Sequence, residues 1–150
     1  MATTGDRSIF LDSNVLVYAN VAEAPLHAVS LAKIKYYHES GWEIWISPQV
    51  IREFLVVRTR PQNFSGDCSI ETLIERVEYF RRTFRMALDT PATLDKLTRL
   101  LTEIKIGGKQ IHDANIVASM MTYGVKNLLT HNVSDFNRYA SLITVVPLVN

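Results

Sequence analysis

The chain has 150 residues, which is enough for one domain with a sizeable core and too few for two. Hydrophobic residues make up 47% of it, which argues against disorder, and no apolar run approaches the roughly 18 residues that a membrane span needs. Lysine and arginine number 16 against 15 aspartate and glutamate, so the charge is nearly balanced.

The first half of the chain alternates short apolar runs with helical patterns. In chain order we expect strand 9–11, a helical turn at 15–19, helix 27–40, strand 43–46 and helix 48–58. Gly41 stops the helix that precedes it in the way that a C-terminal glycine does. Ser47 and Pro48 open the next one, with serine as the N-cap and proline in the first turn. The breakers in segment 60–67 indicate a loop.

The second half continues the alternation. In chain order we expect helix 70–80, a possible strand at 84–88, helix 91–101, helix 111–123, strand 126–130 and strand 142–146. Apolar residues in helix 70–80 recur at spacings of three and four. Thr90 and Pro91 repeat the cap-and-proline signature, and Gly124 ends the helix before it. Strands that alternate with helices predict an α/β fold with a parallel sheet covered on both faces.

In such a fold the functional cleft lies outside the carboxyl ends of the strands. Four acids are candidates for such a cleft. Asp12 closes the first strand, Glu53 lies in the helix after the second, Asp113 is in the first turn of helix 111–123, and Asp135 follows strand 126–130 by five residues. They are far apart in sequence, so only the parallel-sheet topology would bring them to one edge. Clustered carboxylates repel one another, and the usual remedy is a hard cation with oxygen ligands, Mg²⁺ or Mn²⁺.

Asp113 is the strongest of the four candidates. At 100° per residue it falls on the apolar side of its helix, among Ile116, Val117 and Met120. The opposite side carries no charged residue, so we expect the helix to be buried nearly all round. The alternative is a first-turn aspartate stabilised by the helix dipole. That alternative explains an acid in the turn but not one that faces the core, where an unpaired carboxylate costs several kcal/mol.

The other three acids each have a plain structural alternative. Glu53 lies at the border of the apolar face of its helix, where a surface glutamate is nearly as good an explanation. Asp12 has an even alternative as an N-cap, although Ser13 or Asn14 would cap equally well and leave it free. Asp135 is the weakest, because it is also explained as an acid in the first turn of a short helix.

Other kinds of site find little support. The four histidines are scattered and no cysteine–histidine pair has zinc spacing; His112 and His131 are possible cleft residues, with a structural role as the commoner outcome. There is neither a phosphate-binding loop nor a nucleophile elbow. Cys68 is the one cysteine, so an internal disulfide is excluded and we expect it in a loop or at an edge. The polar start and the short apolar run after it favour a cytoplasmic protein.

The acids lie within ordered motifs that resemble those of PIN-domain nucleases. These are Phe10 to Ala19, Arg52-Glu53-Phe54, His112-Asp113-Ala114 and Leu129 to Asn132 followed by Asp135-Phe136. The match is closest to the VapC-like toxins of bacterial type II toxin–antitoxin systems. Order and spacing agree from about Ser8 to Leu148, which predicts one PIN domain over 1–150.

The resemblance implies a three-layer α/β/α fold around a mainly parallel five-stranded sheet. It implies an endoribonuclease that depends on Mg²⁺ or Mn²⁺, a homodimer, and a cognate antitoxin that blocks the site. Asp12, Glu53, Asp113 and Asp135 match the acidic positions of the family. Ser13 and Thr130 match its small hydroxyl positions, and Asn14 is expected beside them. Asn132 departs from the further acid that many members carry, so a second ion would bind more weakly or only with substrate.

The distribution of charge fits a polyanionic substrate. With four carboxylates set aside for metal, 11 acids remain against 16 bases, which leaves a basic surface. The candidate substrate-binding residues are His112, Arg52, Arg82 and Arg85. A solvated helix face is the commoner meaning of such an arginine run. Hydrolysis of RNA by water predicts 5′-phosphate and 3′-hydroxyl ends.

Two rival interpretations remain open. One is a DNA-directed nuclease with the same metal chemistry, because recognition of the 2′-hydroxyl leaves no readable motif. The other is a non-catalytic PIN-like binding module, which the loss of any of the four acids would have favoured. A response-regulator receiver is excluded, because the chain lacks an acidic pair after the first strand and a lysine after the last one.

Overall fold

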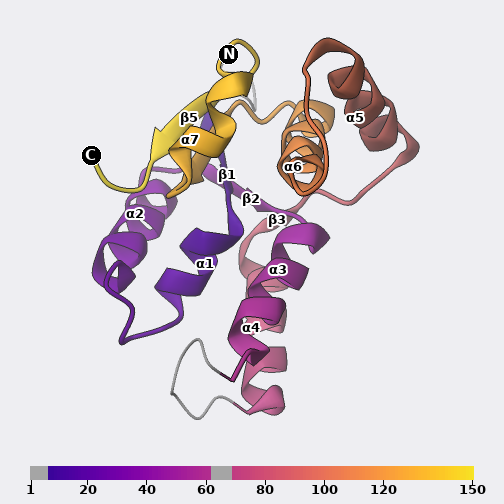
Figure 1. The fold of residues 1–150 in the computed structure, drawn as a ribbon. Coiled ribbons are helices and arrows are strands. Elements are labelled where there is room, and N and C mark those ends of the chain that lie inside the picture. Colours follow the sequence, from indigo (N-terminus) through magenta and orange to yellow (C-terminus); the bar gives the residue numbers. More distant parts are fainter. Residues whose placement is uncertain (1–6, 62–68) are drawn as a thin grey trace.

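A five-stranded sheet runs through the centre of the computed structural model, which describes residues 7–61 and 69–150 (Figure 1). The strands are, in chain order, β1 Ser8–Leu11, β2 Glu43–Ile46, β3 Arg85–Met86, β4 Asn127–Thr130 and β5 Thr144–Pro147. They lie in the order β3-β2-β1-β4-β5, and every neighbouring pair is parallel. The expected parallel five-stranded sheet is therefore confirmed. Cys68 lies outside the described residues.

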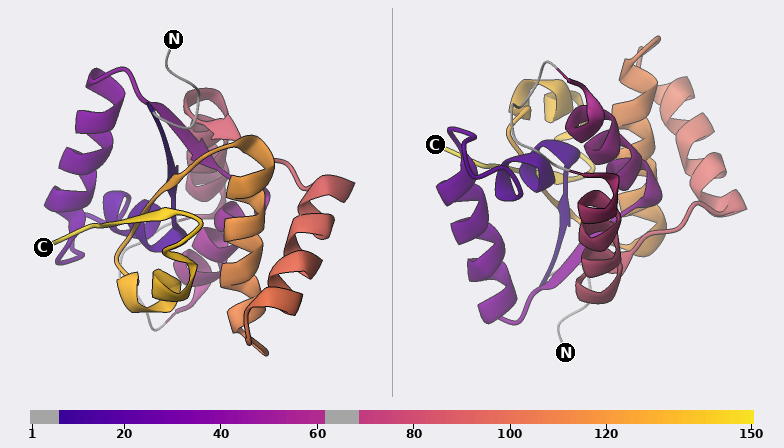
Figure 2. Two further views of the ribbon diagram at one scale, coloured as in Figure 1. Left: turned by 90° about the horizontal axis from the view of Figure 1, so that it is seen from above. Right: turned by 90° about the horizontal axis from the view of Figure 1, so that it is seen from below.

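Helices cover both faces of this sheet. They are α1 Ser13–Ala19, α2 His27–Glu39, α3 Pro48–Thr59, α4 Ile70–Thr83, α5 Pro91–Glu103, α6 Gln110–Tyr123 and α7 Val133–Phe136. Figure 2 shows α2 on one side of the strands and the α5–α6 pair on the other. Within the described ranges, none of these helices has the length and apolarity to cross a membrane.

Capping residues set where several helices begin and end. Ser47 accepts a hydrogen bond from the backbone N–H of Val50 at 3.3 Å and so opens α3, as the sequence predicted. Thr90 and Thr93 form a reciprocal capping box at the start of α5. Gly124 ends α6 with a φ of +71°, a backbone conformation that L side chains rarely adopt. These caps fix the lengths of the helices that lead to and from the sheet.

The register of the central strands brings three strand ends together. Phe10 of β1 pairs with Trp45 of β2 on one side and with Leu128 of β4 on the other. All four residues of β1 are buried, because the strand has a neighbour on each side and helices over each face. The residues that follow these strands therefore emerge at one edge of the sheet. Among them are Asp12 after β1 and the residues after Thr130 of β4.

The outer strands differ from their predicted bounds. Strand 84–88 is reduced to Arg85–Met86, because the N–H of Phe84 still bonds the carbonyl of Phe80 at the end of α4. Strand 142–146 begins later, at Thr144, because Leu142 and Ile143 donate to the carbonyl of Tyr139 in a turn. Apolar residues mark both segments, but only part of each reaches a neighbouring strand.

Candidate active site

Asp12 occupies the first position after β1, and its two carboxylate oxygens have different partners. Oδ1 accepts the backbone N–H of Ser13 at 2.8 Å, so Asp12 is the N-cap of α1. The expectation that Ser13 or Asn14 would cap and leave Asp12 free is wrong: Asp12 directly precedes the helix and is the residue with extended backbone dihedrals. Oδ2 accepts from Thr130 Oγ1 at 2.8 Å and from Asn14 Nδ2 at 3.2 Å. Capping therefore uses only one of the two oxygens.

The surroundings of Asp12 raise its pKa to about 6. Burial is the largest cause, since only 5% of the residue is exposed. The hydrogen bonds from Thr130, Ser13 and Asn14 act in the opposite direction, and the negative charge of Glu53 raises the pKa further. The effect of Glu53 shows that α3 brings its carboxylate into the electrostatic neighbourhood of β1.

Thr130 and Asn14 fix the wall of the site on the β4 side. Thr130 is fully buried at the end of β4, and its Oγ1 accepts the N–H of Asn132 at 2.9 Å. Asn14 donates weakly to Thr130 Oγ1 at 3.4 Å and accepts the N–H of His131 at 3.2 Å. These bonds join the first turn of α1 to the segment after β4, and Asp12 lies between them.

Asp113 lies in the first turn of α6, and its pKa is raised to about 7. Partial burial is the largest cause, followed by the negative charges of Asp12, Asp135 and Glu53. Arg138 acts in the opposite direction. These four acids come from different parts of the chain, and the charges of three of them raise the pKa of the fourth, Asp113. The structure thus brings all four predicted acids into one electrostatic neighbourhood.

Glu53 is held by a residue that the sequence analysis did not select. Gln49 is buried one helical turn earlier on α3, and its Nε2 donates to Glu53 Oε2 at 3.0 Å and to the carbonyl of His112 at 2.8 Å. Its Oε1 accepts from Asn115 Nδ2 at 2.8 Å. Gln49 therefore joins Glu53 to both sides of Asp113 on α6. A polar residue four positions before Glu53 on the same helix face was the available signal.

Asp135 is the most exposed of the four acids. It lies in the short helix α7, as an acid in the first turn, which was the alternative offered for it. Its charge nevertheless contributes to the raised pKa of Asp113, so it lies near the same centre. Asn132 precedes α7 and is exposed beside it.

The donor set fits a hard cation. Among the described residues, no group of three or more acidic, histidine or cysteine side chains lies so that it could hold a metal ion as arranged. The other three carboxylates are nevertheless close enough to raise the pKa of Asp113, and the positive charge of Arg138 lowers it. Carboxylate oxygens with this unbalanced charge are the ligands that Mg²⁺ and Mn²⁺ take in proteins. The sequence analysis predicted Asp12, Glu53, Asp113 and Asp135 as the ligands of such an ion, and this stays a prediction.

The sequence from residue 9 to residue 142 matches the family model of the PIN domain. This chain belongs to the PIN domain family. A comparison of the sequence with curated proteins finds no match. The expected α/β PIN-like fold is thereby confirmed.

Solved structures share the fold of this PIN domain at low sequence identity. VapBC2 from Rickettsia felis, bound to a DNA fragment from its promoter, matches at 19% identity and a TM-score of 0.66, over 93% of this chain and 98% of that one. FitAcB from Neisseria gonorrhoeae matches at 14% identity and a TM-score of 0.66, over 93% of this chain and 97% of that one. VapC20 from Mycobacterium tuberculosis, a sarcin–ricin loop cleaving toxin, matches at 16% identity and a TM-score of 0.59, over 80% of this chain and 86% of that one.

A cavity of about 680 Å³ adjoins the acids of this PIN domain, and we refer to it as the α3–α6 cavity. Its lining residues are Ser13, Gln49, Arg52, Glu53, Val56, Val57, Arg60, Lys109, His112 and Asn132. Two of the four predicted substrate-binding residues, Arg52 and His112, are among them. Arg60 and Lys109, at the end of α3 and just before α6, were not among the predicted residues.

The other two predicted substrate-binding residues lie elsewhere. Arg85 does not line the α3–α6 cavity; its guanidinium pairs with Glu43 at 2.8 Å and lies 6.0 Å from the centre of the Trp45 ring. Arg82 is exposed in the last turn of α4 and does not line this cavity either. The cations that line the α3–α6 cavity therefore come from α3 and from the residue before α6, not from the arginine run.

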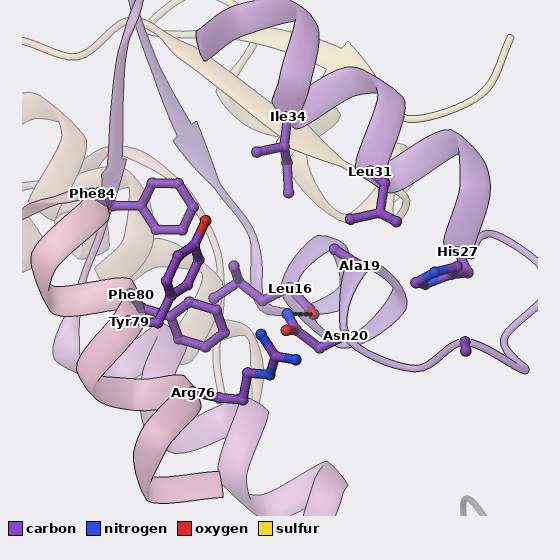
Figure 3. A pocket seen from close by; sticks show the side chains of 11 residues that line it. Leu16, Ala19, Asn20, His27, Leu31, Ile34, Arg76, Tyr79, Phe80 and Phe84 are labelled. Carbon is purple, nitrogen blue, oxygen red and sulfur yellow. Dashed lines mark hydrogen bonds between the residues drawn. The ribbon is translucent and has the colours of Figure 1, made fainter. Parts of the chain in front are cut away.

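A second cavity of about 390 Å³ lies between α1, α2 and α4 (Figure 3). Leu31 and Ile34 of α2 face it from one side, and Tyr79, Phe80 and Phe84 face it from the other. None of the predicted site residues lines it. It is a largely apolar surface separate from the acids.

Proposed function

We propose that this PIN domain is a metal-dependent endoribonuclease and the toxin of a toxin–antitoxin pair. One observation carries the nuclease assignment: burial and, after it, the negative charges of Asp12, Asp135 and Glu53 raise the pKa of Asp113 on α6 to about 7. An isolated acid would avoid such a position, and a cluster of this kind is stable when a cation binds it. Membership of the PIN domain family supports the same reading.

A bound Mg²⁺ or Mn²⁺ would activate water for attack on a phosphodiester and offset the charge that develops on the phosphate. The residues of this chain have defined tasks around it. Thr130 and Asn14 orient one oxygen of Asp12, and the hydrogen bond from the backbone N–H of Ser13 holds the other. Gln49 orients Glu53. Asp113 and Asp12 would have to lose their protons for a cation to bind. A cation bound at neutral pH would favour the charged form of both carboxylates.

Support for RNA as the substrate comes from the resemblance of the motifs and from the fold shared with VapC20, a toxin that cleaves the sarcin–ricin loop. The test uses two strands of one sequence, one of RNA and one of DNA, end-labelled and incubated with Mg²⁺ or Mn²⁺. We expect cleavage of RNA alone, with 5′-phosphate and 3′-hydroxyl ends. A 2′,3′-cyclic phosphate would contradict hydrolysis by water, and cleavage of DNA alone would assign the site to a DNA-directed nuclease.

The proposed partner is an antitoxin protein, since several matching structures are toxin–antitoxin complexes. We assign it the cavity between α1, α2 and α4, because Leu31 and Tyr79 leave 46% of their surface exposed there. Arg76 at its rim has no carboxylate partner among the described residues, so an apolar segment with an acidic residue fits it. Leu31→Arg should abolish inhibition by the co-purifying antitoxin and leave RNA cleavage intact.

The resemblance also predicts a homodimer, and we retain this as a proposal. The exposed leucines Leu88 and Leu94 supply apolar surface away from the antitoxin cavity. Sedimentation of the antitoxin-free protein measures its mass directly; a monomer at micromolar concentration would contradict the proposal.

A further inference from the structure

Two aromatic side chains anchor the segment that follows β4 and carries Asp135. In this segment α7 runs directly into a short 3-10 turn, Asn137–Tyr139. Phe136 and Tyr139 are both fully buried, and their ring centres lie 6.4 Å apart. Side chains three residues apart are therefore neighbours here, as they are in a regular helix. The aromatic pair fixes which face of the segment packs against the core and which faces solvent.

The exposed face of the same segment carries one acid and one base. Asp135 and Arg138 are exposed, are three residues apart, and each directly precedes one of the buried aromatic residues. By that spacing their side chains leave the segment on the same side. The segment is tied to the site at its start, because Thr130 Oγ1 donates to Asp12 and accepts the N–H of Asn132. Arg138 thus lies one turn beyond Asp135 along a segment that is joined to the acids.

The positive charge of Arg138 acts on the acids. It lowers the pKa of Asp113 on α6, against the three carboxylates that raise it. In the described residues Arg138 forms no ion pair, not even with Asp135, whereas Arg81 bonds Glu78 at 3.1 Å across the same spacing. Several other arginines of the described ranges also lack an ion pair. What distinguishes Arg138 is therefore its position beside the acids, with its guanidinium still available to an anion.

We propose that Arg138 binds the phosphate group that is cleaved, as a further catalytic residue on the α7 side of the four acids. This inference rests on the proposed nuclease function. A guanidinium presents paired N–H donors that match two oxygens of one phosphate. Carboxylates alone would repel that phosphate. Arg138 supplies a positive charge on the exposed side of the acids, where the substrate approaches.

The step that Arg138 assists is the hydrolysis of one phosphodiester. The oxygen of a water molecule bonds phosphorus, and the bond from phosphorus to the 3′ oxygen breaks. One proton of the water passes to that 3′ oxygen, and the other stays on the new 5′-phosphate or dissociates to solvent. Negative charge on the two remaining phosphate oxygens grows during the attack, so a guanidinium bound to them stabilises the transition state more than the ground state. Loss of Arg138 should therefore lower kcat more than it raises KM.

Arg138→Gln tests this assignment through opposite effects on two measurements. For an end-labelled RNA that the wild type cuts, kcat should fall by about a hundred-fold or more. The Kd for Mn²⁺, measured by calorimetry without RNA, should fall at least about two-fold, because a positive charge beside the acids is removed. A variant that merely distorted the acids would lose both activity and Mn²⁺ affinity. Arg138→Lys keeps the charge but not the fork, so it should bind Mn²⁺ like the wild type and recover only part of the rate.

Arg99→Gln is the matched control. Arg99 is an exposed arginine of α5 that also has no ion pair in the described part of the chain. Its replacement should leave kcat and Mn²⁺ affinity at their wild-type values. The proposal is overturned if folded Arg138→Gln keeps the kcat of the wild type, if the two variants lose equal activity, or if Arg138→Gln weakens Mn²⁺ binding.

A binding titration in EDTA separates this assignment from the proposed nuclease. A fluorescein-labelled oligouridine is titrated with the wild type and both variants between about 50 and 200 mM salt. One phosphate contact on a single strand contributes about 0.7 to the slope of log Kd against log salt, so Arg138→Gln should lower the slope by about that amount and Arg99→Gln should not. Cleavage by the wild type with an unaltered slope and kcat in Arg138→Gln rejects only the role of Arg138. A lowered slope without cleavage by the wild type keeps Arg138 as a phosphate ligand and rejects the nuclease.

Discussion

Asp12 shows how one side chain satisfies both interpretations that its sequence position allows. One oxygen caps α1 through Ser13, and the other accepts Thr130 and Asn14. A carboxylate has about four acceptor positions, and these three bonds leave capacity for a further ligand. The sequence offered cap and site as alternatives because it cannot assign the two oxygens separately. In the structure the cap orients the residue and does not exclude it from the acidic cluster.

Asp113 should make the stability of the cation-free protein depend on pH. Folding raises its pKa from 3.8 to about 7, so between these values the folded state binds the proton more tightly than the unfolded state. The stability contribution of this residue is therefore lost as pH rises from about 4 to about 7. Asp113→Asn removes this titration. Relative to wild type, the variant should gain unfolding free energy as pH rises from 5 to 7.5, measured by urea unfolding in EDTA. A difference that stays constant with pH would contradict this.

Gln49 should matter more for activity than its cost in stability explains. Gln49→Met leaves Asn115 and the carbonyl of His112 without their partner and should lower the unfolding free energy by about 1–3 kcal/mol. It also releases Glu53, so kcat should fall by about ten-fold or more. Asn20→Ala is the control, since it removes a 2.7 Å bond to Leu16 in the other cavity. Equal activity losses in the two variants would contradict a positioning role.

At the scale of elements, local chemistry predicted the helices better than the outer strands. Caps such as Ser47 and stops such as Gly124 act within a few residues, so their effects can be read from the sequence. A strand ends where its neighbour stops offering partners. Only Arg85 and Met86 pair with β2, and the N–H of Ala87 makes one more bond to Ile46 before the chain leaves the sheet. The spacing of apolar residues alone does not show where the pairing between β3 and β2 ends.

The N-cap of α3 should affect both stability and activity, because this helix carries Gln49 and Glu53. Ser47→Ala removes the bond to the N–H of Val50 and should cost about 1 kcal/mol. Ser69→Ala removes the equivalent cap of α4, where Ser69 accepts the N–H of Thr72 at 3.1 Å and no site acid follows. Both variants should lose similar stability in chemical unfolding, but only Ser47→Ala should slow RNA cleavage. If both or neither slow it, the cap does not position the site.

For the whole molecule, topology accounts for how the acids meet. The parallel sheet was predicted from the alternation of strands and helices, and its carboxyl edge was the place to look for a site. The α3–α6 cavity and the Gln49 bonds were not predicted, because they depend on how α3 packs against the start of α6. Gln49 and His112 are 63 residues apart, and no local pattern links them. The ion pair of Arg85 was not predicted either, because its partner Glu43 lies on another strand; its role in RNA binding stays a prediction.

A cation should stabilise the whole domain, because it offsets repulsion between carboxylates from separate elements. Protons compete with it, since Asp12 and Asp113 have pKa values of about 6 and 7. The rise in Tm on adding Mn²⁺ should therefore be larger at pH 7.5 than at pH 5.5, and Asp12→Asn should reduce it at pH 7.5. Thermal unfolding followed by circular dichroism measures it. A rise of equal size at the two pH values would place the ion elsewhere.

The central claim is that the four acids form a metal-dependent ribonuclease site, and one cleavage experiment tests it most directly. Purified, antitoxin-free protein is incubated with total RNA in Mg²⁺, Mn²⁺ or EDTA, beside the near-isosteric variant Asp113→Asn. We expect discrete RNA fragments with the wild type in either metal, none in EDTA, and none with the folded variant. Cleavage that persists in EDTA or in Asp113→Asn would contradict the claim, as would intact RNA after incubation of folded wild type with either metal.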